Sequence, residues 1–176
     1  MARIPDWSAI LTPLGGPKEP GATDAQLAAL NDLWKPLAES DLRWLVESDS
    51  PRAHMWLIAG RRPPESYVSF LRWSNGGSFS NGERRFEPFF RVPRDAADEG
   101  LLLRETMLGY GVPEAMPHVL PFAFDGRGVF AAFDMRDEPI DAEFPIVAFH
   151  ASTCCWPEAT RVGSTFEAFC RGTTRY

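Results

Sequence analysis

Helical spacing of apolar residues is clearest between residues 64 and 77. The apolar positions that share one helical face there are Tyr67, Phe70 and Leu71. Pro64 is preset for the first turn of a helix, and Asn75 followed by Gly76 is typical of a left-handed helix end. The pattern predicts a short helix with a sharp exit.

Two apolar runs further along the chain, residues 120–124 and 129–135, predict a β-hairpin. The residues between them are Asp125, Gly126, Arg127 and Gly128. A phosphate loop would need Lys and Ser or Thr after its glycines, and a calcium loop would need a run of oxygen ligands that ends in Glu. A tight turn in which the Asp side chain caps its own backbone explains the four residues more simply. We therefore expect a hairpin with a buried second strand.

Two more segments carry strand signals. Asn81-Gly82 stands before the run 84–92, and Asn-Gly between apolar runs is the strongest short hairpin signal. The run contains Pro88, so we expect an edge strand or a bulged strand there. Residues 145–150 predict a third apolar strand, after the first hairpin.

Capping patterns mark the remaining helices. Thr23 and Gln26 form a capping box before apolar residues at helical spacing, and Pro36 should kink or end that helix. The other predicted helices are residues 41–47, residues 94–108, and a last helix with a capping box of Ser164 and Glu167 that turns Phe166, Phe169 and Cys170 inward. The apolar run 55–59 is too short to distinguish a strand from a buried helix.

Residues 11–22 are dense in Pro and Gly, which neither a helix nor a strand tolerates. We therefore expect residues 1–22 to form a flexible arm and residues 23–176 to form a single domain. N-terminal helices, followed by a mainly antiparallel sheet with helices packed against it, give the α+β class. The length of 176 residues and the hydrophobic content of 44% suit one domain with its own core.

The helix and the first hairpin together resemble the SUKH superfamily of Smi/Knr-like proteins. The usual pattern of that family is a Leu-Pro-x-x-Tyr-x-x-Phe-Leu helix that ends in Asn-Gly-Gly, followed by an Ala-x-Asp-Gly-x-Gly hairpin. The resemblance covers roughly residues 60–172, and Pro63 stands where Leu is common. The residues that it implies as fold-maintaining are Pro64, Tyr67, Phe70, Leu71, Asn75, Gly76, Gly77, Asp125, Gly126 and Gly128.

The resemblance also implies a function. Bacterial members of the superfamily are commonly immunity proteins that bind and neutralise polymorphic toxins, often nucleases, in the producer cell. It therefore implies a non-enzymatic domain that blocks a toxin by occlusion, with a contact surface that varies with the toxin. The fungal relatives imply an alternative, a regulatory or scaffolding adaptor for a cellular protein.

The net charge of the chain is compatible with this function. The chain has 18 basic and 24 acidic residues and a net charge of -6, which argues against a general nucleic-acid binder. A basic protein partner, such as a basic toxin domain, fits better. The first residues lack the apolar stretch of a secretory signal, and no apolar run reaches the length of a membrane helix, so we expect a cytoplasmic protein.

Acidic residues gather between residues 134 and 143, where Arg136 is the one base. The acids are Asp134, Asp137, Glu138, Asp141 and Glu143. A solvated loop between two strands explains such a run, and an acidic surface for a cationic partner is the functional interpretation. Trp156 is a candidate aromatic anchor beside the loop, although it and Trp73 also suit core positions. We take the five acids and Trp156 as the candidate partner-binding residues.

The signals for an enzyme are weaker. Cys154, Cys155 and Cys170 are too few and too irregularly spaced for a disulfide framework, so reduced thiols are expected. His150 with Cys154 and Cys155 suggests a metal, but a closed zinc site needs four ligands. A nucleophilic cysteine with a distant histidine base stays open, and the candidate bases are His54, His118 and His150. We predict no catalytic residue, metal or cofactor, and keep a small thiol or metal enzyme as a third hypothesis.

Overall fold

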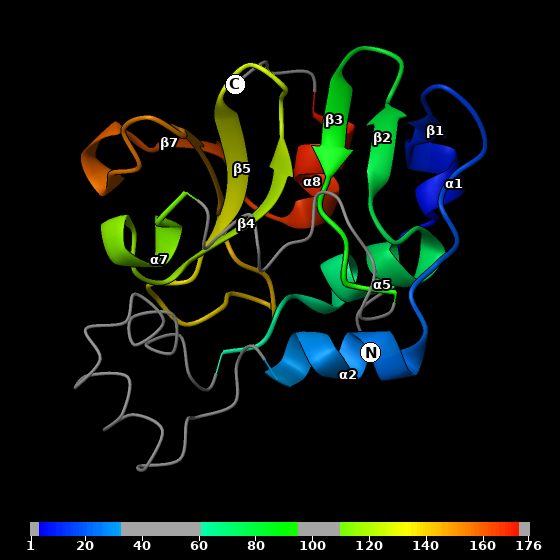
Figure 1. The fold of residues 1–176 in the computed structure, drawn as a ribbon, viewed down its shortest axis with the longest axis horizontal. Helices are drawn as coiled ribbons and strands as arrows, with labels where there is room; N and C mark the ends of the chain where they lie inside the picture. Colours follow the sequence, from blue (N-terminus) through cyan, green and yellow to red (C-terminus); the bar gives the residue numbers. More distant parts are fainter. Residues whose placement is uncertain (1–3, 33–60, 95–109, 173–176) are drawn as a thin grey trace.

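Residues 4–32, 61–94 and 110–172 are described by a computed structural model, and seven strands of these residues form one antiparallel sheet (Figure 1). The strands are β1 (Thr12–Pro13), β2 (Gly77–Ser80), β3 (Arg85–Phe89), β4 (Val119–Phe124), β5 (Val129–Asp134), β6 (Ile146–His150) and β7 (Thr160–Gly163). The helices are α1 (Trp7–Ile10), α2 (Asp24–Asp32), α5 (Glu65–Trp73), α7 (Val112–Ala115) and α8 (Phe166–Arg171), with a 3₁₀ helix at Trp156–Glu158.

The sheet is a meander in which each strand pairs with its neighbours in the chain. The junction between β3 and β4 is the shortest, with Phe89 opposite Ala123 and the N–H of Phe90 donating to the carbonyl of Phe122 at 2.9 Å. The sheet thus consists of a three-stranded part and a four-stranded part that meet at this junction. An antiparallel sheet with helices packed on it confirms the predicted α+β class.

A cluster of aromatic rings joins one face of the sheet to α5 and α8. Phe166 of α8 is fully buried, and its ring centroid lies 5.1 Å from that of Phe122, 5.2 Å from Tyr67 and 5.3 Å from Trp7. Phe122 lies at a bulge of β4, where the register with β5 shifts. Because these rings come from a strand and three helical segments, their burial fixes α1, α5 and α8 on this face.

The opposite face of the sheet carries a second aromatic group, because successive strand residues point to opposite sides. Phe130 of β5 is fully buried there, and its ring lies 5.1–5.9 Å from four others. Its neighbours are Phe90, Tyr110, Phe124 and Phe149. Strand β5 is therefore buried on both faces, as predicted for the second strand of the hairpin.

The turn between β4 and β5 has the predicted chemistry. Oδ1 of Asp125 accepts hydrogen bonds from the N–H groups of Arg127, at 2.7 Å, and Val129, at 2.9 Å. Gly126 and Gly128 have φ angles of 73° and 106°. The Asp side chain and the two glycines thus form a tight turn that closes the hairpin.

Helix α5 lies where the sequence predicts it, with Pro64 as its N-cap. At its other end the buried side chain of Asn75 donates from Nδ2 to the carbonyl of Val92 at 2.8 Å and accepts from the N–H of Val92 at 3.0 Å. Gly76 has a φ of 81°, and a Cβ there would lie 2.9 Å from the Cβ of Arg91. The Asn-Gly pair therefore fixes the helix exit against the chain that leaves β3.

The predicted hairpin at Asn81-Gly82 joins β2 to β3 and confirms the prediction of a bulged strand. Oδ1 of Asn81 accepts from the N–H of Arg84 at 2.8 Å. The register shifts by one residue on β3 between Phe86 and Phe89, the stretch that contains Pro88. The bulge lets an interior strand carry a proline, which cannot donate to the sheet.

Residues 4–22 contribute α1, β1 and buried side chains to the domain, where the sequence predicts a flexible arm. Trp7 is 3% exposed, and β1 pairs with β2. A Cβ on Gly21 would lie 1.8 Å from the carbonyl oxygen of Arg72, so only glycine permits this approach to α5. The flexible arm is therefore wrong for these residues, because the Pro and Gly residues bend the segment around the domain.

Helix α2 begins with the predicted capping box, since the N–H of Thr23 donates to Oε1 of Gln26 at 2.8 Å and the N–H of Gln26 to Oγ1 of Thr23 at 3.3 Å. At α8 the predicted cap, Ser164, is wrong by one residue. Thr165 is the N-cap, and its Oγ1 accepts from the N–H of Ala168 at 3.1 Å. The side chains that α8 buries are those predicted, Phe166, Phe169 and Cys170.

Four predicted features lie outside the described residues. They are the kink or end at Pro36, the helix at 41–47, the apolar run 55–59, and all but the first residue of the helix at 94–108. None of the helices in the described ranges is long and apolar enough to cross a membrane.

Candidate protein-binding surface

The acidic loop, residues 134–143, connects β5 to β6 and starts with a charge clamp. Arg136 donates from Nε and Nη2 to the carboxylate of Asp134 at 2.9 and 2.8 Å. Burial alone would raise the pKa of Asp134, but the hydrogen bonds and the charge of Arg136 hold that pKa below its ordinary value. The Asp134 carboxylate is therefore ionised and is already paired within the fold.

Trp156 supports this clamp from the other side. The guanidinium carbon of Arg136 lies 3.7 Å from the centroid of the indole ring, close enough for a cation–π contact. The indole N–H donates to the carbonyl of Pro117 at 3.3 Å, and the side chain is half-buried. Trp73, the other tryptophan considered as an anchor, packs against Phe79 in the core. Trp156 thus holds the loop in place rather than projecting from it.

Arg61 anchors the next part of the acidic loop from a distant position in the chain. Its guanidinium donates to the carbonyl of Asp137 and, at 3.2 Å, to the carbonyl of Arg136. It also lies 3.4 Å from the carboxylate of Glu138, whose side chain is 87% exposed. Because the two carbonyls are bound directly, residues 136–138 have a defined backbone position.

The end of the acidic loop is a two-residue turn. Ile140 and Glu143 exchange two backbone hydrogen bonds of 3.0 and 2.9 Å. The two residues between them, Asp141 and Ala142, have φ angles of 52° and 63°. Both angles are positive, as in the type I′ turns that suit tight hairpins. The carboxylate of Glu143 accepts from the N–H of Phe166 at 3.2 Å and so ties the turn to the start of α8.

The Ala142→Gly variant is expected to be more stable than the wild-type protein by about 0.5 kcal/mol. Relief of a left-handed alanine gains roughly 1 kcal/mol, and the greater freedom of glycine in the unfolded chain offsets part of it. Urea unfolding would measure the difference. As a control, Ala28→Gly alters an exposed alanine in the middle of α2 and should lower stability. A loss of stability at both positions would contradict the positive φ at residue 142.

The structure thus divides the six candidate partner-binding residues into two groups. Three are engaged within the fold, namely Asp134, Glu143 and Trp156. The other three, Asp137, Glu138 and Asp141, are exposed on the anchored loop, and Glu138 also forms an exposed ion pair with Arg61. Ile140, which the sequence analysis did not single out, is 73% exposed among them. The exposed part of the loop therefore has one apolar side chain, with three exposed acids within three residues of it in the chain.

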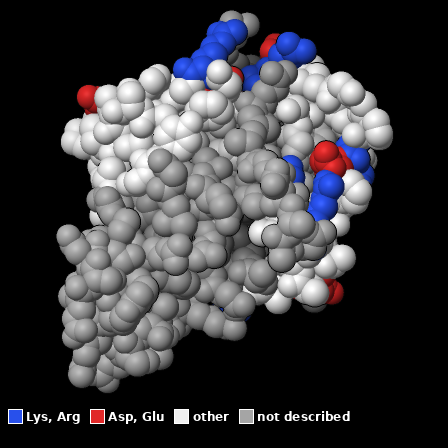
Figure 2. Space-filling model, in the orientation of Figure 1, with Lys and Arg blue, Asp and Glu red and all other residues white. Residues whose placement is uncertain are grey.

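The remaining charge on the described residues is not gathered into a second acidic surface on the face that Figure 2 shows. In that view Lys and Arg lie in one group toward the top, the end where Figure 1 places the β2–β3 and β4–β5 turns, and in a second group at the right, and the visible Asp and Glu are scattered. A cationic partner would gain little from the described residues on this face.

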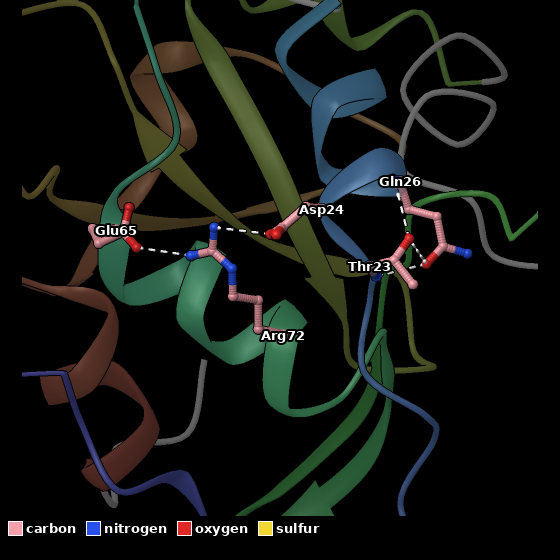
Figure 3. Close-up of polar contacts among 5 residues, drawn as sticks. All are labelled: Thr23, Asp24, Gln26, Glu65 and Arg72. Atoms are coloured by element: carbon pink, nitrogen blue, oxygen red, sulfur yellow. Dashed lines mark hydrogen bonds and ion pairs between the residues drawn. The ribbon is translucent and has the colours of Figure 1, made fainter.

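A groove with a volume of about 420 Å³ lies between α2 and α5. Arg72 spans part of it, with Nη1 3.0 Å from Glu65 and Nη2 3.4 Å from Asp24, as Figure 3 shows. Leu27 and Val68 supply apolar lining. All three charged side chains are substantially exposed, so these ion pairs contribute little stability. With charges of both signs at its rim, the groove favours no ligand of one charge.

Of the residues that suggested a metal or a thiol enzyme, His150 and Cys154 have local hydrogen bonds, Nδ1 of His118 is buried without a hydrogen-bond partner among the described residues, and His54 lies outside them. Nδ1 of His150 lies 2.7 Å from Oγ of Ser152, and Sγ of Cys154 donates to the carbonyl of Ala151 at 3.1 Å. Burial raises the pKa of the Cys154 thiol, which disfavours the reactive thiolate. Across the three described ranges, no group of three or more His, Cys, Asp or Glu side chains is arranged to hold a metal ion.

Comparison with known protein families gives a match over most of the chain. A sequence model of the SMI1 / KNR4 family (SUKH-1) matches residues 59–172, which is more than half of the chain. The match begins just before α5 and includes β2 to β7 and α8. No curated protein matches the chain.

Proposed function

Because the chain belongs to the SMI1/KNR4 family (SUKH-1), we propose that it is a non-enzymatic protein-binding domain that neutralises a toxin. The partner is a protein with a basic surface, such as a nuclease domain that binds nucleic acid. The chain acts by occlusion, because a bound acidic loop covers the cationic surface that the toxin needs for its substrate. This proposal extends the toxin-immunity role that the family resemblance implies.

The exposed acids of the acidic loop are the observation that carries the proposal. Asp137, Glu138 and Asp141 project from a backbone that Arg61 and the Ile140–Glu143 pair hold in place. Carboxylates on an ordered loop attract a cationic partner and raise its association rate. They also disfavour acidic partners. A loop of this kind is suited to binding a basic protein and has no need of a catalytic group.

The double variant Asp137→Lys/Glu138→Lys is expected to bind the partner at least about tenfold more weakly, mainly through a slower association rate. Its thermal stability should stay close to wild type, since exposed substitutions usually change stability by less than about 0.5 kcal/mol. The partner for this test is the protein that the tagged wild-type chain retains from a lysate of its source organism. Surface plasmon resonance at low and at high salt would measure the rates.

A charge-matched control separates a local effect from a change in net charge. Asp137→Lys alone and Glu83→Lys change the net charge equally, and Glu83 is an exposed acid on the β2–β3 turn. The first should slow association and the second should not. Equal binding by the wild-type protein and the double variant would exclude the acidic loop as the surface.

A further inference from the structure

Ile140 is an apolar side chain in a place where the rest of the loop is polar. It is 73% exposed, more than Ile4 at 65% or Tyr110 at 49%, the other large apolar side chains that stand out in the described residues. A single exposed apolar residue is ordinary on a protein surface. Ile140 differs from an ordinary exposed residue because its backbone is held in place and acidic residues lie close to it in the chain.

The loop holds Ile140 in a fixed position. Its N–H and carbonyl groups both bond to Glu143, and the carboxylate of Glu143 is bound by the N–H of Phe166. On the other side, Arg61 binds the carbonyls of Arg136 and Asp137. A residue whose backbone is held in this way adds little backbone ordering cost when it is buried in an interface, so more of its burial energy appears as affinity.

The turn at this tip places Ala142 in the left-handed region, which is uncommon for alanine. Asp141 and Ala142 both have a positive φ, a conformation that costs free energy for residues other than glycine. The two backbone hydrogen bonds between Ile140 and Glu143 hold this turn, and the Ile140 side chain stays 73% exposed beside it.

The charges around Ile140 restrict what can cover it. Asp137, Glu138 and Asp141 are exposed beside it, so any surface that buries Ile140 also approaches these carboxylates. A second copy of this chain, packed symmetrically, would bring its own acids against them and be repelled. An anionic membrane is disfavoured for the same reason. A protein with an apolar pocket and a cationic rim satisfies both the apolar and the charged part of the surface.

We propose that Ile140 is the central anchor of the partner interface and inserts into an apolar pocket of the partner that is rimmed by Lys or Arg side chains. The proposal rests on the proposed function, since it assigns the chemistry of the surface that binds the basic partner. The acids steer the encounter, and Ile140 supplies the slow dissociation. Such a division is typical of interfaces in which a buried central residue carries much of the binding energy.

The first test is a titration of the purified partner, the stoichiometric protein retained by the wild-type chain, into three variants. Ile140→Ala should raise the Kd on the order of tenfold or more, through faster dissociation. Ile140→Val, which keeps most of the apolar surface, should stay within about threefold of wild type. Ile4→Ala, the matched removal of another exposed isoleucine, should leave the Kd unchanged.

The salt dependence of the Kd distinguishes the contribution of Ile140 from that of the acidic residues. The ratio of Kd values between Ile140→Ala and wild type should be the same at low and high salt, because apolar contact is not screened. The corresponding ratio for Asp137→Lys/Glu138→Lys should shrink as salt is added. Thermal unfolding of Ile140→Ala should match wild type, which excludes a folding defect as the cause of weaker binding.

A photo-crosslinking amino acid at position 140 tests the chemistry of the pocket. The expected product joins position 140 to an apolar segment of the partner flanked by Lys or Arg. A crosslink to a second copy of this chain, or to an acidic segment, overturns the proposal. The proposal is also overturned if Ile140→Ala binds the partner with wild-type affinity while the double charge variant binds weakly. In that case the proposed function stands. If the wild-type chain retains no stoichiometric partner, the proposed function itself fails.

Discussion

The Phe166→Ala variant is expected to lower the free energy of unfolding by about 4 kcal/mol, the range for removal of a fully buried phenylalanine. Phe166 lies in the aromatic cluster that joins α1 and α5 to the sheet, with ring contacts to Trp7, Phe70 and Phe133 among others. The cavity left by alanine would therefore open between three helical segments and the sheet. Equilibrium unfolding in urea measures the loss.

Two further variants keep this prediction testable if Phe166→Ala does not fold. Phe166→Leu fills most of the volume and should cost about 1.5 kcal/mol. Phe124→Ala removes a half-buried ring that contacts Phe130 on the other face, and should cost about 2 kcal/mol. A larger loss for Phe124→Ala than for Phe166→Ala would contradict the placement of the main core between the sheet and α8.

The Asn75→Ala variant is expected to lose roughly 3 kcal/mol, because each buried backbone group left unpaired costs about 1–3 kcal/mol. The Asn75 side chain is 1% exposed, and its amide satisfies both the N–H and the carbonyl of Val92. Alanine would leave both groups without a partner and would release the exit of α5 from the chain after β3. Thermal and urea unfolding both report this loss.

Asn75→Asp separates the hydrogen bonds from the shape of the side chain. An ionised carboxylate accepts from the N–H of Val92 but cannot donate to its carbonyl, so the variant should be strongly destabilised at neutral pH. A protonated carboxyl can donate, and burial raises the pKa of the new group above its unfolded value. Its penalty should therefore shrink as the pH falls through the folded pKa. A penalty independent of pH would contradict the two-bond geometry.

Local signals account for the elements that the sequence predicts well. The turn at Asp125 depends on a side chain that bonds to backbone two and four residues away, and the exit of α5 depends on the positive φ of Gly76. Such signals depend on residues that are close together in the chain. The hairpins and α5 could accordingly be predicted, and their positions in the structure agree.

The sequence alone does not predict the elements that are too short or too weakly patterned for periodicity. Helices α1 and α7 are four residues long, too short for helical periodicity to register. Strand β7 begins with Thr160 and Arg161, both exposed, and shows no alternation of buried residues. The path of residues 4–22 is set by contacts such as that of Gly21 with α5, between positions far apart in the chain. The positions of these elements depend on tertiary packing, which local sequence patterns do not reveal.

The candidate surface was predicted in part. The run of acids indicated the acidic loop, but the sequence does not reveal that Arg136 binds Asp134 and stacks on Trp156. The anchor of the loop, Arg61, is distant in sequence from the carbonyls that it binds. An isoleucine between Pro139 and Asp141 in a polar run was visible in the sequence, yet its exposure follows only from the turn.

Growth of a bacterial test strain that expresses the partner, with and without this chain, tests the central claim most directly. We expect the partner alone to stop growth and the wild-type chain to restore it. The Asp137→Lys/Glu138→Lys and Ile140→Ala variants should restore it less at equal expression. A partner that is harmless alone would contradict the account and favour the adaptor function. A toxic partner that the wild-type chain binds without restoring growth would contradict neutralisation.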